Sequence, residues 1–289
     1  MTLLQTHHMI IRTLLRLIPQ RLKLLLYGFA TRYGIPISPG IHRLPCGLVL
    51  KITSNDPTGN EAAGLGFIQS LQGVNAPHLI DVVCTPSAAY LLSTWISGDC
   101  CGEIWEQLTE SDKERLVAEL RTQFSAIRRQ TADRRQLICT ASGAPICDPR
   151  IPWFSEESPR VLSSCQDFLA EVWVGLTLSS NIETIRPIIQ PLIERQDIPI
   201  IFCHGDLLPR NLILPGGLKC WRAGSTAVFL IDWEYSGWMP VPWEALKATW
   251  LCCDYENEWY VMMRRVFPES LVDLDADWEW RSKSRITIL

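Results

Sequence analysis

The sequence contains no Cys-x-x-Cys pair, and only five of its 289 residues are histidines. The ligand spacing of a structural zinc site is therefore missing. The eleven cysteines are an odd number and include two adjacent pairs, Cys100-Cys101 and Cys252-Cys253, which seldom bridge to each other. We therefore expect reduced thiols and a cytoplasmic protein.

A long uninterrupted apolar run is also missing. Residues 1–32 are rich in leucine and isoleucine, but Arg12, Arg16 and Pro19 interrupt every stretch of about 18 apolar residues. This argues against a membrane-spanning helix and against a signal peptide with an apolar core. We expect a basic amphipathic helical extension at residues 1–32 that docks on the body of the protein. Attachment to a membrane surface and a mitochondrial presequence are the less favoured alternatives.

Acidic residues are absent from residues 1–55, which hold seven lysines and arginines. The whole chain has a net charge of −4, which leaves −11 for residues 56–289. An acidic chain gives no reason to expect nucleic acid as a partner. The acidic part is compatible with a cationic substrate, although a solvated acidic surface is the simpler interpretation.

Short strands and one helix are expected in residues 33–98. "GIHRL" and "GLVLKI" flank a turn at residues 45–47 and predict a hairpin. "PTGNEAAGLGFIQSL" predicts a helix, because Leu65, Ile68 and Leu71 recur on one face. "HLIDVV" and "AYLLSTWI" predict two more strands. Residues 33–98 are therefore predicted to form a small lobe built on a sheet.

Helical patterns dominate residues 99–289. Thr109 is a candidate N-cap for a helix with apolar residues at three- and four-residue spacing. Residues 138–160 predict a long loop, and helical patterns return around residues 163–195. Two strands, "NLIL" and "VFLID", are expected on either side of the glycine-rich "PGGLKCWRAGSTA". The tryptophan-rich remainder is expected to be mostly helical.

Polar side chains cluster around these two strands. Asp206 and Asn211 lie five residues apart in "HGDLLPRN", directly before "NLIL", and Asp232 ends "VFLID". Turn formation explains an isolated Asp or Asn, but the combination also suits phosphoryl transfer from ATP. That reaction needs oxygen ligands for Mg²⁺ and a group that positions the attacking hydroxyl. The spacing His-x-Asp-x-x-x-x-Asn is that of the kinase catalytic loop.

A second charged pair lies near the N-terminus. Lys51 interrupts the apolar strand "GLVLKI", where a charge is costly without partners. Glu61 opens the following predicted helix, ten residues later. A strand lysine paired with a helix glutamate contacts the phosphates in kinases. Glu61 can instead close a capping box with Thr58, and the sequence leaves both interpretations open.

Five stretches of the sequence carry a resemblance to a known superfamily. They are "IHRLPCGLVLKI", "NEAAGLGFI", "LLSTWISG", "FCHGDLLPRNLIL" and "IDWEYSGWMPVPWEALKA". In this order the chain resembles the aminoglycoside phosphotransferase and choline kinase superfamily, and within it the fungal phosphotransferase-like proteins. The resemblance covers residues 20–268. It implies an α+β, protein-kinase-like fold of two lobes, at residues 33–98 and 99–289, with ATP and Mg²⁺ as cofactors.

The resemblance also implies residue roles. Asp206 matches the catalytic base, and Asn211 and Asp232 match the Mg²⁺ ligands. Lys51 matches the phosphate-binding lysine and Glu61 its partner, while His204 would support the loop by hydrogen bonds. The hinge that meets the adenine corresponds to Ser93, Thr94, Trp95 and Ile96.

Three features depart from the pattern of related kinases. No G-x-G-x-x-G loop precedes Lys51, and the only candidate cover for the phosphates is "ISPGIHRL", with Gly40. Arg210 stands where antibiotic kinases have glycine, which argues against an aminoglycoside acceptor. Trp-Glu rather than Phe-Gly follows Asp232, and no Ala-Pro-Glu motif follows it, which argues against protein-kinase activity.

The function expected from the sequence is ATP- and Mg²⁺-dependent phosphorylation of a hydroxyl group on a small molecule. The alternative is a nucleotide-binding pseudokinase or scaffold without turnover, which the incomplete phosphate cover favours. Four residues with kinase roles argue for the enzyme. We interpret Glu244 and Lys247, farther along the chain, as a surface or internal ion pair. The sequence leaves the acceptor and the oligomeric state open.

Overall fold

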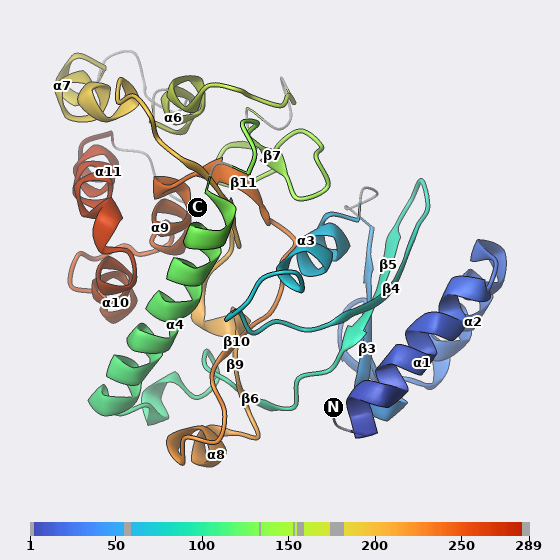
Figure 1. The fold of residues 1–289 in the computed structure, drawn as a ribbon. Coiled ribbons are helices and arrows are strands. Elements are labelled where there is room, and N and C mark those ends of the chain that lie inside the picture. Colours follow the sequence, from blue (N-terminus) through green and yellow to red (C-terminus); the bar gives the residue numbers. More distant parts are fainter. Residues whose placement is uncertain are drawn as a thin grey trace.

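The computed structural model describes residues 3–54, 59–132, 134–152, 154, 159–173 and 182–284. A five-stranded antiparallel sheet forms near the N-terminus, and most of the helices lie in the remainder of the chain (Figure 1). Sheet and helices are therefore segregated along the sequence, as in α+β proteins. The predicted fold class is confirmed.

The N-terminal sheet contains the four strands predicted in residues 33–98 and one further strand, β1. They are β1 (Ile35–Ser38), β2 (Ile41–Leu44), β3 (Leu48–Thr53), β4 (Leu79–Cys84) and β5 (Ala89–Thr94), in the order β1-β2-β3-β5-β4. The predicted hairpin is confirmed, since a single 3-10 turn, Pro45–Gly47, joins β2 to β3. Ile41 lies opposite Lys51, so the turn between β1 and β2 lies close to this lysine.

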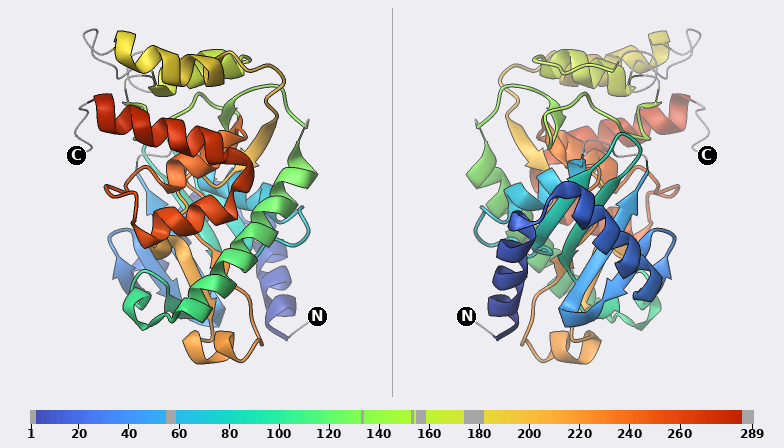
Figure 2. Two further views of the ribbon diagram at one scale, coloured as in Figure 1. Left: turned by 90° about the vertical axis from the view of Figure 1, so that its left-hand side faces the viewer. Right: turned by 90° about the vertical axis from the view of Figure 1, so that its right-hand side faces the viewer.

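Helices cover both faces of this sheet. They are α1 (Leu3–Leu17), α2 (Gln20–Tyr33) and α3 (Asn60–Ile68). Figures 1 and 2 show α1 and α2 on the outer face and α3 on the face toward the rest of the protein. Leu50 packs with Leu15 and Tyr27 of the outer helices, whereas the next residue, Lys51, contacts Glu61 of α3. Alternation along β3 therefore places the lysine on the inner face of the sheet.

Two small sheets form the centre of the C-terminal part. One has the order β10-β9-β6, from β6 (Gly98–Cys100), β9 (Leu212–Pro215) and β10 (Phe229–Leu230). The other has the order β7-β11-β8, from β7 (Cys139–Thr140), β8 (Ile200–Cys203) and β11 (Gly237–Pro240). The predicted strand pair "NLIL" and "VFLID" is confirmed as β9 and β10.

Helices surround these sheets. They are α4 (Glu110–Thr131), α6 (Cys165–Trp173), α7 (Ile182–Ile193), α8 (Leu218–Arg222), α9 (Pro242–Ala248), α10 (Glu258–Val266) and α11 (Leu271–Ser284). Short 3-10 turns lie at Trp105–Gln107, Pro209–Asn211 and Pro268–Ser270. The predicted cap of α4 is confirmed: the Thr109 side chain accepts from the Asp112 N–H, and Asp112 Oδ2 accepts from the Thr109 N–H.

Two elements of the C-terminal part were not predicted individually. The glycine-rich connection between β9 and β10 contains the helix α8, whose buried Trp221 anchors it. The tryptophan-rich remainder is mostly helical, as expected, but it also contains the strand β11, whose backbone completes the sheet between β7 and β8.

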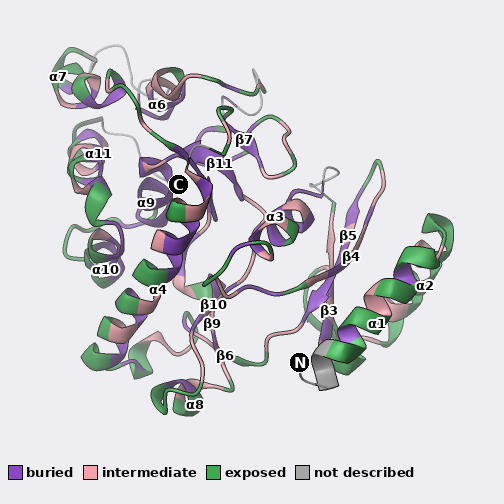
Figure 3. Cartoon of the chain, in the orientation of Figure 1, coloured by how far each residue is buried: buried purple, intermediate pink, exposed green. Residues whose placement is uncertain are grey.

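Figure 3 shows the buried residues concentrated between the N-terminal sheet and the C-terminal helices. None of the eleven cysteines, all within the described residues, forms a disulfide. No helix of the described ranges is long and apolar enough to cross a membrane.

Candidate active site

The loop at residues 204–211 follows β8 and leads into β9. His204 is fully buried; its Nε2 lies 2.9 Å from the Ile231 carbonyl oxygen, and its Nδ1 accepts from the Asp206 N–H at 3.2 Å. Burial lowers the pKa of His204, which favours the neutral ring that these two bonds require. His204 therefore holds the loop in place, as its sequence context suggested.

Asn211 fixes the position of Asp206. Its Nδ2 donates to the Asp206 carbonyl oxygen and to Asp206 Oδ2, both at 2.8 Å. Arg210 donates to the same Oδ2 at 2.9 Å, although 60% of its own side chain is exposed. The carboxylate is therefore held from two sides at the rim of the site.

Asp232 lies at the same end of the β9–β10 pair as Asn211. Leu212 of β9 lies opposite Leu230 of β10, and the Ile231 N–H donates to the Asn211 carbonyl oxygen at 3.0 Å. Asp232 has φ +65°, a left-handed conformation that costs a non-glycine residue about 1 kcal/mol or more. Such conformations concentrate at functional sites.

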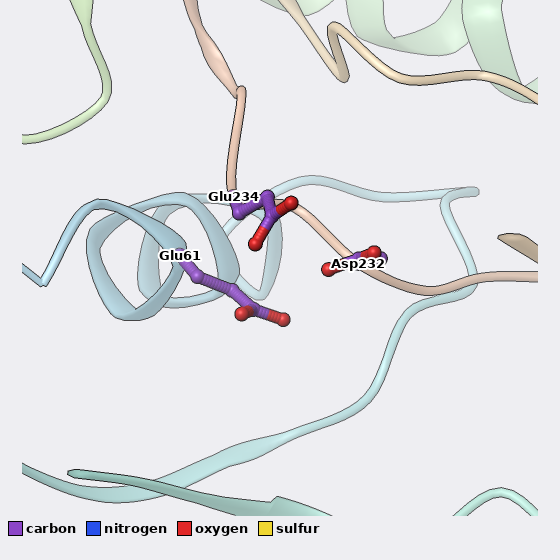
Figure 4. A group of neighbouring side chains, drawn as sticks. All are labelled: Glu61, Asp232 and Glu234. Carbon is purple, nitrogen blue, oxygen red and sulfur yellow. The ribbon is translucent and has the colours of Figure 1, made fainter. Parts of the chain in front are cut away.

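Lys51 lies among three carboxylates. Its Nζ is 2.8 Å from Glu61 Oε2 and 3.2 Å from Glu234 Oε2, and it donates to Asp232 Oδ1. Figure 4 shows Glu61 on α3 and the other two acids on the segment after β10. One oxygen atom from each of the three lies within 4.8 Å of the others. The structure thus brings together the strand lysine and helix glutamate singled out in the sequence. Thr58, the alternative capping partner, lies outside the described residues.

The carboxylates outnumber the ammonium group. Burial alone would lower the pKa of Lys51, but the charges of Glu61, Asp232 and Glu234 outweigh burial and raise it. Burial raises the pKa of Glu61, with Lys51 opposing the rise. Burial also raises the pKa of Glu234, and the nearby Asp232 adds to the effect. A site with excess negative charge is suited to a cation.

Sequence reasoning missed two residues that assemble this cluster, Glu234 and Asn60. Asn60 Nδ2 donates to the carbonyl oxygens of Glu234 and Ser236, at 2.8 and 2.9 Å. At Gly64, a Cβ atom would lie 2.2 Å from Ser236 Oγ, so only glycine allows this approach of α3. In the sequence, the position of Glu234 two residues after Asp232 could have indicated a second acid at the site. No local sequence feature indicated the role of Asn60.

Glu244 is a third residue whose role was missed. Its Oε2 accepts the N–H groups of His204 and Gly205, at 2.6 and 3.2 Å, from a fully buried position on α9. The expected pairing with Lys247 was wrong, because Lys247 binds Asp148 at 2.8 Å. An acid within the apolar segment "VPWEALKA" was the signal in the sequence. Glu244 supports the loop that carries Asp206.

Glu244→Gln is expected to flatten the pH dependence of stability between about pH 4.5 and 7. Burial raises the pKa of Glu244 from 4.5 to about 7, while the loop N–H groups oppose the rise. The folded state therefore binds more protons in this window, and its free energy of unfolding falls as pH rises, by up to about 3 kcal/mol. Urea unfolding of both proteins at pH 5 and 7.5 measures the difference. The exposed Glu256→Gln should retain the wild-type slope, and an unchanged slope in Glu244→Gln would contradict the expectation.

The four residues matched to the hinge differ in their surroundings. Ser93 and Thr94 lie inside β5 and are buried, between β3 and β4. The N–H groups of Thr94 and Trp95 donate to the carbonyl oxygens of His78 and Gly47, at 3.0 and 2.8 Å. Ile96 lies just beyond the strand, in the connection to β6. Two N–H groups of the matched hinge are thus already engaged in holding the sheet together.

The turn before β2 was the candidate cover for the phosphates. Gly40 has φ +75°, and its carbonyl oxygen accepts the Ile52 N–H at 2.8 Å. A Cβ atom at this position would lie 2.6 Å from the Ile52 carbonyl oxygen. Glycine is therefore required by the packing of this turn onto the strand that carries Lys51.

A lysine on the inner face of a sheet, a helix glutamate and the loop from Asp206 to Asn211 form an arrangement known from kinase-like phosphotransferases. Solved structures share the fold. An apo thermostable mutant of aminoglycoside phosphotransferase APH(4)-Ia is 13% identical, with a TM-score of 0.53 over 83% of this chain and 79% of that one. A protein described as a fructosamine-3-kinase of Haemophilus somnus 129PT is also 13% identical, with a TM-score of 0.50 over 82% and 74%. They confirm the protein-kinase-like fold.

The family follows from the sequence itself. The model of the choline/ethanolamine kinase family matches residues 105–256, more than half of the chain. The chain belongs to this family, and the predicted membership of the aminoglycoside phosphotransferase and choline kinase superfamily is confirmed. No curated protein gives a significant match. The chain is thus related to small-molecule phosphotransferases.

Proposed function

We propose that this protein transfers the γ-phosphoryl group of ATP to a hydroxyl group of a small molecule, with Mg²⁺ as cofactor. The contact of Lys51 with Asp232 carries the proposal, because it joins the N-terminal sheet to the segment after β10 beside the Asp206 loop. The family supports the reaction class. A thermostable mutant of aminoglycoside phosphotransferase APH(4)-Ia has been solved in a ternary complex with AMP-PNP and hygromycin B. It is 13% identical to this chain, with a TM-score of 0.50 over 84% of this chain and 81% of that one.

In the proposed reaction Asp206 orients the acceptor hydroxyl and accepts its proton. The hydroxyl oxygen bonds to the γ-phosphorus while the bond from the γ-phosphorus to the β–γ bridging oxygen breaks, and ADP leaves. Asn211 keeps the carboxylate aimed through the 2.8 Å bond to Oδ2, and its second bond holds the Asp206 backbone at the carbonyl oxygen. Arg210, bonded to the same carboxylate and largely exposed, is placed to meet the incoming acceptor.

The donor set suits Mg²⁺, which prefers carboxylate and amide oxygens. Asn211 and Asp232 are the proposed ligands, and Glu234, whose carboxylate oxygen lies within 4.8 Å of one of Asp232, adds a third ligand and a second acid to the set. When bound, Mg²⁺ would neutralise charge on the phosphate oxygens of ATP. Lys51, with Glu61 as its partner, would contact the same phosphates.

The adenine is proposed to meet the backbone at Ile96 and the residues after it. The N–H groups of Thr94 and Trp95 already donate within the sheet. The backbone group that contacts the adenine is therefore expected near the end of the matched segment. This connection also separates the proposed lobes, residues 33–98 and 99–289. Residues 1–32 remain the proposed helical extension.

Asp232→Asn is expected to remove most of the gain in ATP affinity that Mg²⁺ provides. Loss of one ligand charge should weaken this gain at least about 10-fold, the lower end of the effect of disturbing a metal site. Calorimetric titration of ATP, with and without Mg²⁺, measures the gain in the wild type and the variant. The exposed Asp197→Asn serves as control. Equal ATP affinity of the wild type with and without Mg²⁺ would contradict the metal assignment.

The acceptor is tested by ATP consumption over a panel of hydroxyl compounds. Choline, ethanolamine and a fructosamine belong in the panel because similar proteins are named for them, and hygromycin B because a similar structure was solved in complex with it. Acceptor-dependent release of ADP would establish the enzyme. Mg²⁺-dependent nucleotide binding without turnover on any compound would favour the nucleotide-binding scaffold instead.

A further inference from the structure

The outer side of α1 and α2 exposes an unusual amount of apolar surface. Nine of the seventeen large hydrophobic side chains that are exposed in the described residues lie on α1 and α2. On α2 the exposed residues are Leu22, Leu25, Leu26, Phe29 and Tyr33, 43–71% accessible. Their spacing of three and four residues places them on one stripe of the helix. We call the outward side of α1 and α2 the N-terminal face.

The two helices expose this surface although they are docked on the sheet. Leu15 and Tyr27 are buried against Leu50 and Leu92 of the sheet, so the opposite side of each helix already has its partner. A helix packed on a globular protein normally presents polar residues outward. An apolar outward stripe of this length marks a surface that binds a partner or a membrane.

The charge of the N-terminal face is of one sign. Residues 1–55 hold seven lysines and arginines and no acid, and Arg16, Arg21 and Arg32 are exposed on the two helices. Asp81, the one acid within the strands β1 to β5, is already bound by Lys23 at 2.6 Å and by Tyr27 at 2.5 Å. The cationic side chains around the apolar stripe therefore have no carboxylates to balance them in their own segment.

A cavity of about 280 Å³ lies at the edge of this face. Its lining includes His8, Met9 and Arg12 of α1 together with His78 and Gln69. Arginine and imidazole beside methionine offer an anionic head group a place next to the apolar surface.

Two occupants can cover an apolar face of this size, a second copy of the chain or a bilayer. In a two-fold dimer the same surface meets itself, so exposed arginines would face arginines. A bilayer with anionic lipids matches both features, because the apolar stripe enters the acyl boundary while the arginines meet the head groups. We propose that the N-terminal face binds the surface of an anionic membrane, with α1 and α2 lying in its plane.

Docking in this way leaves the candidate active site open. Leu50 and Lys51 point to opposite faces of the sheet, so the helices that contact the membrane lie behind the site (Figure 2). The proposal is independent of the proposed enzymatic function, and its test needs no acceptor.

The test is co-sedimentation of the full chain with vesicles. Wild type should bind phosphatidylcholine vesicles containing 30% phosphatidylserine, bind less at high salt, and bind pure phosphatidylcholine weakly. The double variant Leu25→Gln, Phe29→Gln should lose at least about tenfold in affinity, since it removes apolar insertion. The double variant Arg16→Gln, Arg21→Gln should lose about 30-fold on anionic vesicles only, at roughly 1 kcal/mol per basic residue.

Leu251→Gln is the matched control, because Leu251 is 52% exposed but lies in the C-terminal part. Its vesicle binding should equal that of the wild type, and thermal melting should show every variant folded. No binding of the wild type to anionic vesicles would overturn the proposal. A wild-type dimer in analytical ultracentrifugation that the Leu25 and Phe29 variant dissociates would also overturn it, in favour of a second copy.

Discussion

Asp206→Asn is expected to lower kcat by about 10²- to 10⁴-fold while leaving the KM for ATP nearly unchanged. Asparagine has the size of aspartate and can keep a hydrogen bond to Asn211, but it cannot accept the proton of the acceptor hydroxyl. The proposed ATP contacts are made by Lys51, Asp232 and the residues after β5. The loss should therefore appear in the transition state and not in nucleotide binding.

Steady-state kinetics with an acceptor identified in the panel measure this effect. Asp197→Asn is a suitable control, because Asp197 is exposed and has φ +58°, a conformation that asparagine tolerates well. Its kcat should equal that of the wild type. Wild-type turnover in Asp206→Asn would remove Asp206 from the role of base, and a parallel rise in KM for ATP would show that it acts in binding instead.

Asp277→Asn is expected to lower the free energy of unfolding by about 3–5 kcal/mol. Asp277 lies on α11 and is fully buried with Arg150, which it binds. Trp173 of α6 donates to the oxygen that Arg150 binds, Oδ1, at 2.8 Å, and Arg281 lies 3.1 Å from the other oxygen, Oδ2. Asparagine retains an oxygen for Trp173 but removes the charge that faces two buried guanidinium groups.

The matched control lies two residues away on the same helix. Asp275 is 53% exposed and pairs with Arg264, so Asp275→Asn should cost at most about 1 kcal/mol. Urea unfolding with equal m-values for the three proteins gives the comparison. If Asp277→Asn costs no more than Asp275→Asn, the buried ion pair does not stabilise the packing of α11 on the C-terminal core.

Local spacing predicted the parts of the site that lie within one segment. Asp206 and Asn211 are five residues apart within one loop that leads into a strand. Their hydrogen bond is therefore a local contact, which the sequence can indicate. Lys51 stands out because a charge in an apolar strand needs a partner. Glu61 is ten residues away on the next helix, and this pairing too was visible from the sequence.

Contacts between distant segments were not visible in the same way. Lys51 and Asp232 are separated by 181 residues, Asn60 and Glu234 by 174 and Lys247 and Asp148 by 99. Each depends on how whole sheets and helices pack, which no local pattern encodes. The strand β11 illustrates this, because it pairs with β7 and β8, which come from separate segments of the chain.

The sequence by itself determined the α+β class, the order of the elements, the loop spacing and the basic, apolar nature of residues 1–32, because these depend on local propensity and periodicity. Only the tertiary structure decided which charges meet. It gathered Glu61, Asp232 and Glu234 around one lysine and placed Glu244 beneath the Asp206 loop. It also decided which side of α1 and α2 is buried, since periodicity shows that a helix has an apolar face but not what covers it.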